Sequence, residues 1–171
     1  MTDTVVEHKA TALPPRPVPE TGTQPASPIL EQARTRARRD GLPFAGSVTP
    51  QEAWTLFSHG DAALVDVRTA EERKFVGHVP DTLHVAWMTG LSLSRNPRFV
   101  KELENKTGKN EIILLLCRSG KRSAAAAEAA TKAGFSNVFN IQEGFEGDLD
   151  ESQRRGAFNG WRHAGLSWIQ D

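Results

Sequence analysis

Hydrophobic residues in this chain gather in short runs that alternate with amphipathic segments. Two runs, 62–65 and 112–116, are apolar at every position, which is typical of strands buried on both faces of a parallel sheet. Residues 82–86 and 137–141 predict two further strands. Because a parallel strand needs a crossover before the next one, the segments between the runs are expected to be helical.

Helix signals occupy those intervening segments. Residues 49–52 and 69–72 both read as capping boxes, in which a threonine and the glutamate three positions later satisfy the first amides of a helix. A third helix is expected after Asn96, with Phe99 on its apolar side, and a fourth, rich in alanine, over 123–134. Alternating strands and helices with short connections predict an α/β domain with a parallel sheet.

The two ends of the chain differ from this middle part. Residues 1–27 contain five prolines without apolar periodicity and predict a disordered tail; a ligand for a proline-binding domain is the alternative. A helix or linker is expected over 28–41, and the folded domain over 45–145. Residues 146–171 are first acidic and glycine-rich, then aromatic, and predict an extension that packs on the domain.

Charge and cysteine content limit the classes of function that this chain can have. The 21 basic residues balance 21 acidic ones, so no single-signed field favours nucleic acid or an anionic membrane. No run approaches the roughly 18 apolar residues of a membrane span, and the polar start does not resemble a signal peptide, so a cytoplasmic protein is expected. The single cysteine, Cys117, excludes an intramolecular disulfide and a Cys-rich zinc site, and no cofactor or metal is expected.

The segment with the clearest chemistry follows the apolar run 112–116 and leads into the alanine-rich helix. Its residues are Cys117, Arg118, Ser119, Gly120, Lys121, Arg122 and Ser123. A short loop at the carboxyl edge of a parallel sheet turns its amides inward and forms a nest for an anion, next to the free amides of the helix. That potential and the three cations are expected to lower the pKa of the cysteine and yield a nucleophilic thiolate.

A lone cysteine after a buried strand is more often an inert packing residue. Three cations within five residues of Cys117, together with a glycine and a helix start, favour the activated nucleophile. Asp66 and Arg68, which follow the run 62–65, are expected at the same edge of the sheet. A local salt bridge or a capping role is an equally good interpretation of these two residues.

Three motifs in this order resemble the single-domain rhodaneses, a sulfurtransferase family. They are the strand end at 64–68, the Gly-His-Val-Pro sequence at 77–80, and the loop from Cys117 to Ser123. The resemblance implies a rhodanese-like fold, with a central parallel five-stranded sheet flanked by helices on both faces. It further implies that Cys117 accepts a sulfane sulfur as a persulfide and that Asp66 braces the loop through Arg122.

Loop length separates two related chemistries. Cysteine phosphatases, including the Cdc25 type, place an arginine six positions after the nucleophile, whereas here Arg122 stands five positions after Cys117. The smaller ring favours one added sulfur atom over a phosphoryl group. The resemblance implies as partners a small anionic donor such as thiosulfate and a thiol or cyanide acceptor. A protein-to-protein persulfide carrier and a non-catalytic binding module remain alternatives, and a phosphatase ranks below them.

Overall fold

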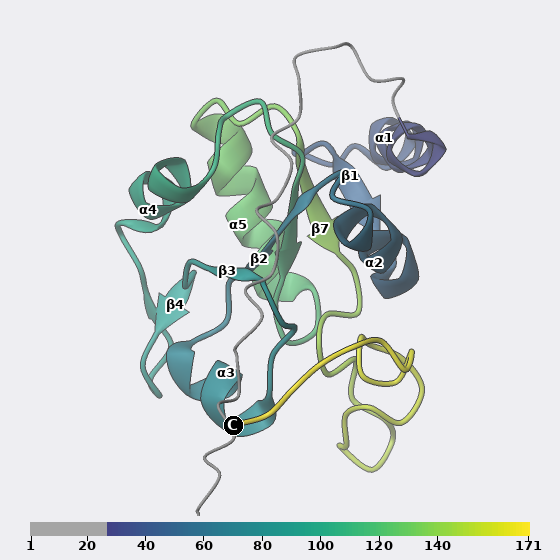
Figure 1. Ribbon diagram of the computed structural model, residues 1–171, viewed down its shortest axis with the longest axis vertical. Coiled ribbons are helices and arrows are strands. Elements are labelled where there is room, and N and C mark those ends of the chain that lie inside the picture. Colours follow the sequence, from purple (N-terminus) through teal and green to yellow (C-terminus); the bar gives the residue numbers. More distant parts are fainter. Residues whose placement is uncertain (1–26) are drawn as a thin grey trace, which may run out of the picture.

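The computed structural model describes residues 27–171 (Figure 1), so the predicted tail, except Ser27, lies outside the described residues. The helices are α1 (Pro28–Asp40), α2 (Pro50–Ser58), α3 (Ala70–Val76), α4 (Phe99–Lys106) and α5 (Lys121–Lys132). The strands are β1 (Gly46–Val48), β2 (Ala63–Asp66), β3 (Leu83–His84), β4 (Met88–Thr89), β5 (Ser94–Arg95), β6 (Ile113–Leu116) and β7 (Val138–Ile141).

Five strands form one parallel sheet in the order β1-β7-β6-β2-β3, which confirms the predicted architecture. The most apolar strand, β6, lies at the centre between β2 and β7. Asp66, at the end of β2, is in register with Leu116, at the end of β6. The residues that follow these two strands therefore emerge next to each other at the carboxyl edge of the sheet.

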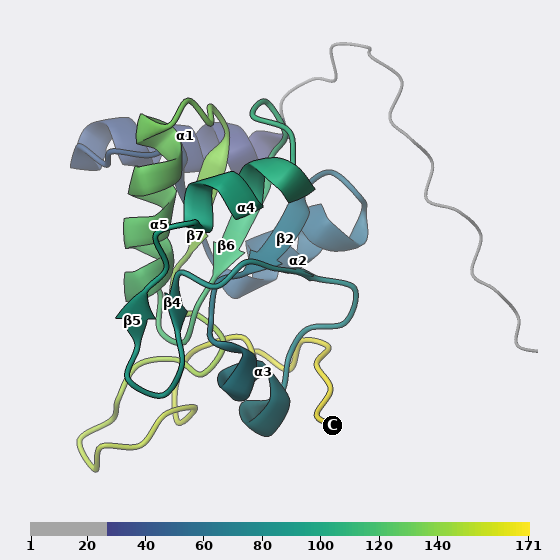
Figure 2. The same ribbon diagram turned by 90° about the vertical axis from the view of Figure 1, so that its left-hand side faces the viewer.

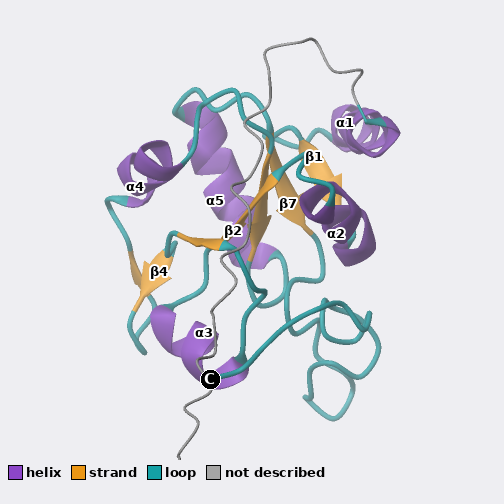
Figure 3. Ribbon diagram, viewed as in Figure 1, coloured by secondary structure: helices purple, strands orange, loops and turns teal. Residues whose placement is uncertain are grey.

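Helices cover both faces of the sheet, as Figure 3 shows. Alternate side chains of β6 point to opposite faces: Leu114 and Leu116 join the core under α1 and α2, while Ile113 and Leu115 join the core under α4 and α5. Cys117 continues this alternation and belongs to the second core. Helix α1, set apart in the sequence as a possible linker, contributes buried side chains to the first core.

Side-chain capping explains the starts of α2 and α3, and several elements differ from expectation. Both capping boxes form, at Thr49 before α2 and at Thr69 before α3. The expected cap at Asn96 lies too early, because α4 begins only at Phe99. The expected strand 82–86 is reduced to Leu83–His84, and β1 and the antiparallel β4–β5 hairpin were not predicted as strands.

The chain ends in loops that pack at the carboxyl edge of the sheet. Trp161 is fully buried and its ring meets that of Trp54 edge-on, while His78 and Ile169 exchange two backbone hydrogen bonds. Figure 2 shows these loops, α3 and the β4–β5 hairpin gathered at one end of the molecule. Among residues 27–171, no helix combines the length and apolarity needed to cross a membrane.

Candidate active site

Cys117 lies at the point where the central strand ends and the loop to α5 begins. Strand β6 ends at Leu116 and α5 begins at Lys121, so only four residues make the turn. Gly120 precedes the helix with φ +92°, a left-handed conformation that favours glycine. This tight turn directs the Gly120 amide, just before α5, toward the cysteine side chain.

The Cys117 sulfur lies inside the turn rather than on the surface. The residue is 1% exposed, and Sγ accepts hydrogen bonds from the Gly120 amide and the Ser123 hydroxyl, each at 3.1 Å. Two hydrogen-bond donors beside a helix N-terminus can stabilise negative charge that develops on this sulfur. The inert packing interpretation does not account for these two donors.

Asn140 of β7 extends this hydrogen-bond network. The Ser123 hydroxyl lies 2.6 Å from Asn140 Oδ1 as well as 3.1 Å from Cys117 Sγ. A hydroxyl has one proton, so it can donate to only one of these acceptors at a time. Cys117 Sγ and Asn140 Oδ1 therefore compete for the Ser123 proton, and negative charge on the sulfur favours donation to sulfur.

The loop is also fixed from outside by the chain that follows β7. The amides of Phe145 and Glu146 donate to the carbonyl oxygens of Cys117 and Arg118, at 2.8 and 2.9 Å. Gly144 makes this approach possible, since a Cβ there would lie 2.5 Å from backbone atoms of Arg118 and it has φ +67°. The ring around the sulfur is therefore a rigid structure.

Arg122 is held by a bidentate ion pair with Glu72 of α3. Its Nη2 and Nη1 lie 2.6 and 2.8 Å from Glu72 Oε1 and Oε2. Burial by itself raises the pKa of Glu72, but the hydrogen bonds from Arg122 and the Thr69 amide outweigh it and hold that pKa below its ordinary value. The pair with Glu72 raises the pKa of Arg122, and the negative charge of Cys117 adds to this effect.

Asp66 and Arg68 form a second, fully buried ion pair beneath the loop. Arg68 donates from Nε and Nη2 to the two carboxylate oxygens of Asp66, at 3.0 and 2.7 Å, and Nη2 also reaches the Gly77 carbonyl at 2.8 Å. The guanidinium lies 4.1 Å from the centre of the Phe145 ring. This pair joins β2, the turn before His78 and the segment that fixes the loop.

One expected contact is wrong. Asp66 was expected to brace the loop through Arg122, but Asp66 binds Arg68, and Glu72 binds Arg122. The reason is the position of α3: its capping glutamate, Glu72, faces the start of α5, whereas Asp66 is enclosed below by Arg68. The local salt bridge considered for Asp66 and Arg68 is the arrangement present.

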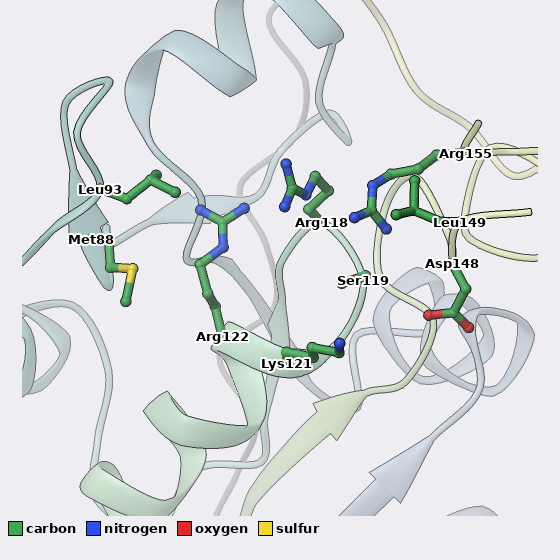
Figure 4. A pocket seen from close by; sticks show the side chains of 9 residues that line it. All are labelled: Met88, Leu93, Arg118, Ser119, Lys121, Arg122, Asp148, Leu149 and Arg155. Atoms are coloured by element: carbon green, nitrogen blue, oxygen red, sulfur yellow. The ribbon is translucent and has the colours of Figure 1, made fainter. Parts of the chain in front are cut away.

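The remaining loop cations face a pocket. Arg118 and Lys121 are exposed and, with Ser119 and Arg122, line a cavity of about 490 Å³. Its other walls come from the β4–β5 hairpin and from the C-terminal segment, which contributes Asp148, Leu149 and Arg155 (Figure 4). In the described part of the chain, no three His, Cys, Asp or Glu side chains cluster as metal ligands.

Comparison with known proteins identifies the family. The rhodanese-like domain family matches residues 49–151 of this chain. The chain belongs to this family. An Arabidopsis thaliana rhodanese relative named thiosulfate sulfurtransferase 16, chloroplastic, is 33% identical over 111 residues, which cover 64% of this chain and 89% of that protein. An uncharacterized Rickettsia rickettsii protein, the RP600 homolog, is 36% identical over 118 residues, which cover 66% of this chain and 87% of the relative.

A solved structure agrees with this assignment of the rhodanese-like domain. The crystal structure of Rv0390 from M. tuberculosis matches 75% of this chain and 99% of its own, with 43% identity and a TM-score of 0.67. A solution structure of the rhodanese-like domain of the Anabaena sp. protein Alr3790 shares the fold, with a TM-score of 0.54 at 13% identity.

Four residues around the rhodanese loop were not singled out from sequence as part of the site: Glu72, Asn140, Leu149 and Arg155. Glu72 was visible as a capping residue, but its second role depends on where α3 lies relative to α5. Asn140 was a polar residue inside an apolar strand, a signal that could have pointed to the site. Leu149 and Arg155 lie in a segment without periodicity, so only the fold places them there.

Proposed function

We propose that this rhodanese-like domain is a sulfurtransferase that carries a sulfane sulfur on Cys117. In the first half-reaction, the Cys117 thiolate attacks the outer sulfur of thiosulfate. The bond between Sγ and that sulfur forms, the sulfur–sulfur bond of thiosulfate breaks, and sulfite leaves with the electron pair. The product is a Cys117 persulfide anion, and no external oxidant or reductant is needed.

In the second half-reaction, an acceptor removes the sulfur. Cyanide or a thiolate attacks the outer sulfur of the persulfide, the bond to Sγ breaks, and the Cys117 thiolate is regenerated. The Gly120 amide and Ser123 hydroxyl, which contact Sγ, are placed to stabilise negative charge at the bottom of the loop. Arg118 and Lys121 provide an attractive field for an anionic donor at its entrance.

One observation supports this proposal above the others: the Cys117 sulfur accepts two hydrogen bonds inside a cationic loop at the start of α5. The relative named thiosulfate sulfurtransferase adds support. A non-catalytic binding module needs no such arrangement around a buried thiol. The loop, with four residues between Cys117 and Arg122, also supports sulfur transfer over phosphate hydrolysis.

The test is a thiosulfate-dependent thiocyanate assay on the full chain and on Cys117→Ser. We expect the variant to lose about a thousandfold or more, the loss typical of a removed nucleophile. Ser136→Ala, on the surface away from the loop, serves as a matched control. Equal turnover by Cys117→Ser and the native chain would rule out the proposal, and Cys117-dependent hydrolysis of an aryl phosphate would favour the phosphatase instead.

A further inference from the structure

The pocket over the loop is larger than a small inorganic donor requires. Its volume of about 490 Å³ lies within the range of roughly 300–1,000 Å³ that is usual for organic ligands. Three separate parts of the fold build it: the loop with the start of α5, the β4–β5 hairpin, and the C-terminal segment. Since thiosulfate would occupy a small part of this space, the pocket has room for a second, organic reactant.

The charge of the pocket is strongly one-sided. Arg118, Lys121 and Arg155 all line it, and none of them forms a salt bridge with another residue in the range 27–171. Arg155 is fixed by its hydrogen bond from Nη1 to the Gly147 carbonyl, at 2.8 Å, and keeps its other donors. The single carboxylate in the wall, Asp148, accepts a hydrogen bond from the side-chain amide of Asn159.

Apolar side chains flank these cations. Met88 and Leu93 come from the hairpin, and Leu149 comes from the C-terminal segment; Leu93 and Leu149 are 40% and 50% exposed. In Figure 4 the hairpin residues lie at one end of the view and Leu149 at the other, with the guanidinium groups between them. The pocket therefore suits an organic molecule with a short hydrocarbon frame and more than one anionic group.

We propose that this pocket is the acceptor subsite and selects a low-molecular-weight thiol that carries two carboxylates. This inference rests on the proposed sulfurtransferase function. The thiolate sulfur of the acceptor bonds to the outer sulfur of the Cys117 persulfide, the bond to Sγ breaks, and the acceptor leaves as its own persulfide. Cys117 is 1% exposed and does not itself line the pocket, whereas its chain neighbours Arg118 and Ser119 do. The reacting atom is the outer sulfur of the persulfide, which lies about 2 Å beyond Sγ. Arg118, Lys121 and Arg155 hold the carboxylates, and Arg155 sets the preference.

The experiment measures the second half-reaction alone. The full chain is loaded with thiosulfate, freed of donor by gel filtration, and mixed with mercaptosuccinate, neutral 2-mercaptoethanol or cationic cysteamine. Mass spectrometry follows the loss of the sulfur adduct. Per unit of thiolate, we expect mercaptosuccinate to react fastest and cysteamine slowest. Raising the ionic strength should reduce the differences between the three rates, because salt screens exposed charges.

Variants of the C-terminal segment test whether Arg155 determines the preference among the three thiols. Arg155→Gln should lower the rate ratio of mercaptosuccinate to 2-mercaptoethanol about tenfold or more, the effect of one lost charge-assisted contact. Arg155→Lys should recover most of the ratio. Arg154→Gln removes an exposed neighbouring charge outside the pocket and should keep the native ratio. Thermal unfolding of each variant identifies any loss of fold.

The outcomes distinguish a failure of the acceptor subsite from a failure of the proposed sulfurtransferase function. If the native chain forms the adduct but discharges it to all three thiols equally, the acceptor subsite is wrong and sulfur transfer stands. The subsite is also wrong if folded Arg155→Gln keeps the native ratio. If thiosulfate leaves no adduct on Cys117, the proposed function fails, and the acceptor subsite fails with it.

Discussion

The cations on the inner side of the Cys117 loop are paired with carboxylates, whereas those on its outer side form no salt bridge within residues 27–171. On the inner side, Arg68 and Arg122 each bind a carboxylate through two nitrogens. On the outer side, Arg118 and Lys121 line the pocket, as Arg122 also does, but unlike Arg122 they form no salt bridge in the part of the chain that the structure describes. Cations that look equivalent in the sequence therefore divide into a set that holds the fold and a set available to a ligand.

Breaking the Asp66–Arg68 ion pair on the inner side should cause the largest loss of stability. Arg68→Met removes a fully buried cation and leaves Asp66 charged without its main partner. We expect a loss of about 3–5 kcal/mol in the free energy of unfolding and a fall of about 10 °C or more in the melting temperature. Calorimetry or thermal circular dichroism measures both.

The double variant Asp66→Asn/Arg68→Met is the matched control for that pair. Because it removes the unpaired charge as well, it should recover part of the stability lost in Arg68→Met. A double variant less stable than Arg68→Met alone would show that the Asp66 charge is not the source of the loss.

The hydrogen bonds at the sulfur should give the next largest effect, on sulfur transfer by Cys117. Ser123→Ala removes the hydroxyl donor that contacts Sγ, and we expect kcat/KM for thiosulfate to fall about ten- to a hundredfold, as for one lost charge-assisted hydrogen bond. Asn140→Leu removes the acceptor that competes for the Ser123 proton, so kcat/KM should stay equal or rise. The thiosulfate-dependent thiocyanate assay measures both effects. A loss in Asn140→Leu as large as in Ser123→Ala would exclude this competition.

The Arg122 pair should give a smaller, pH-dependent effect on stability. Because the pKa of Glu72 is lowered in the folded protein, its contribution is fully present above pH about 4.5 and is lost as the pH falls through the lowered pKa. Glu72→Gln should cost about 1–2 kcal/mol near pH 7. The difference from the native chain should shrink in acid. Urea unfolding at several pH values measures it, and a difference independent of pH would contradict this assignment.

The outer side should give the smallest effect on stability. Lys121→Gln is expected to change the free energy of unfolding by less than about 0.5 kcal/mol. It should lower kcat/KM for thiosulfate about two- to fivefold and reduce its dependence on salt, because an exposed cation attracts the anion through a screened field. Lys132→Gln, at the far end of α5, is the control. Equal effects of the two variants on kcat/KM would show that the position of Lys121 is unimportant.

The division between the two sides also marks what could be read from the sequence. The apolar runs, capping boxes and loop motif predicted the parallel sheet and placed the cations near Cys117, since these depend on local patterns. The partners of those cations depend on how distant elements pack: Glu72 and Arg122 are 50 positions apart. Arg155 lines the pocket from a loop segment without periodicity, so no local sequence pattern predicts its place there.

Detecting an added sulfur atom on Cys117 after incubation with thiosulfate is the most direct test of the proposed function. The full chain is incubated with thiosulfate, freed of small molecules, and analysed by intact-mass and peptide mass spectrometry. We predict a mass increase of one sulfur atom on the peptide that contains Cys117, removed by cyanide with formation of thiocyanate and absent in Cys117→Ser. An unmodified Cys117 after incubation with thiosulfate would contradict the account.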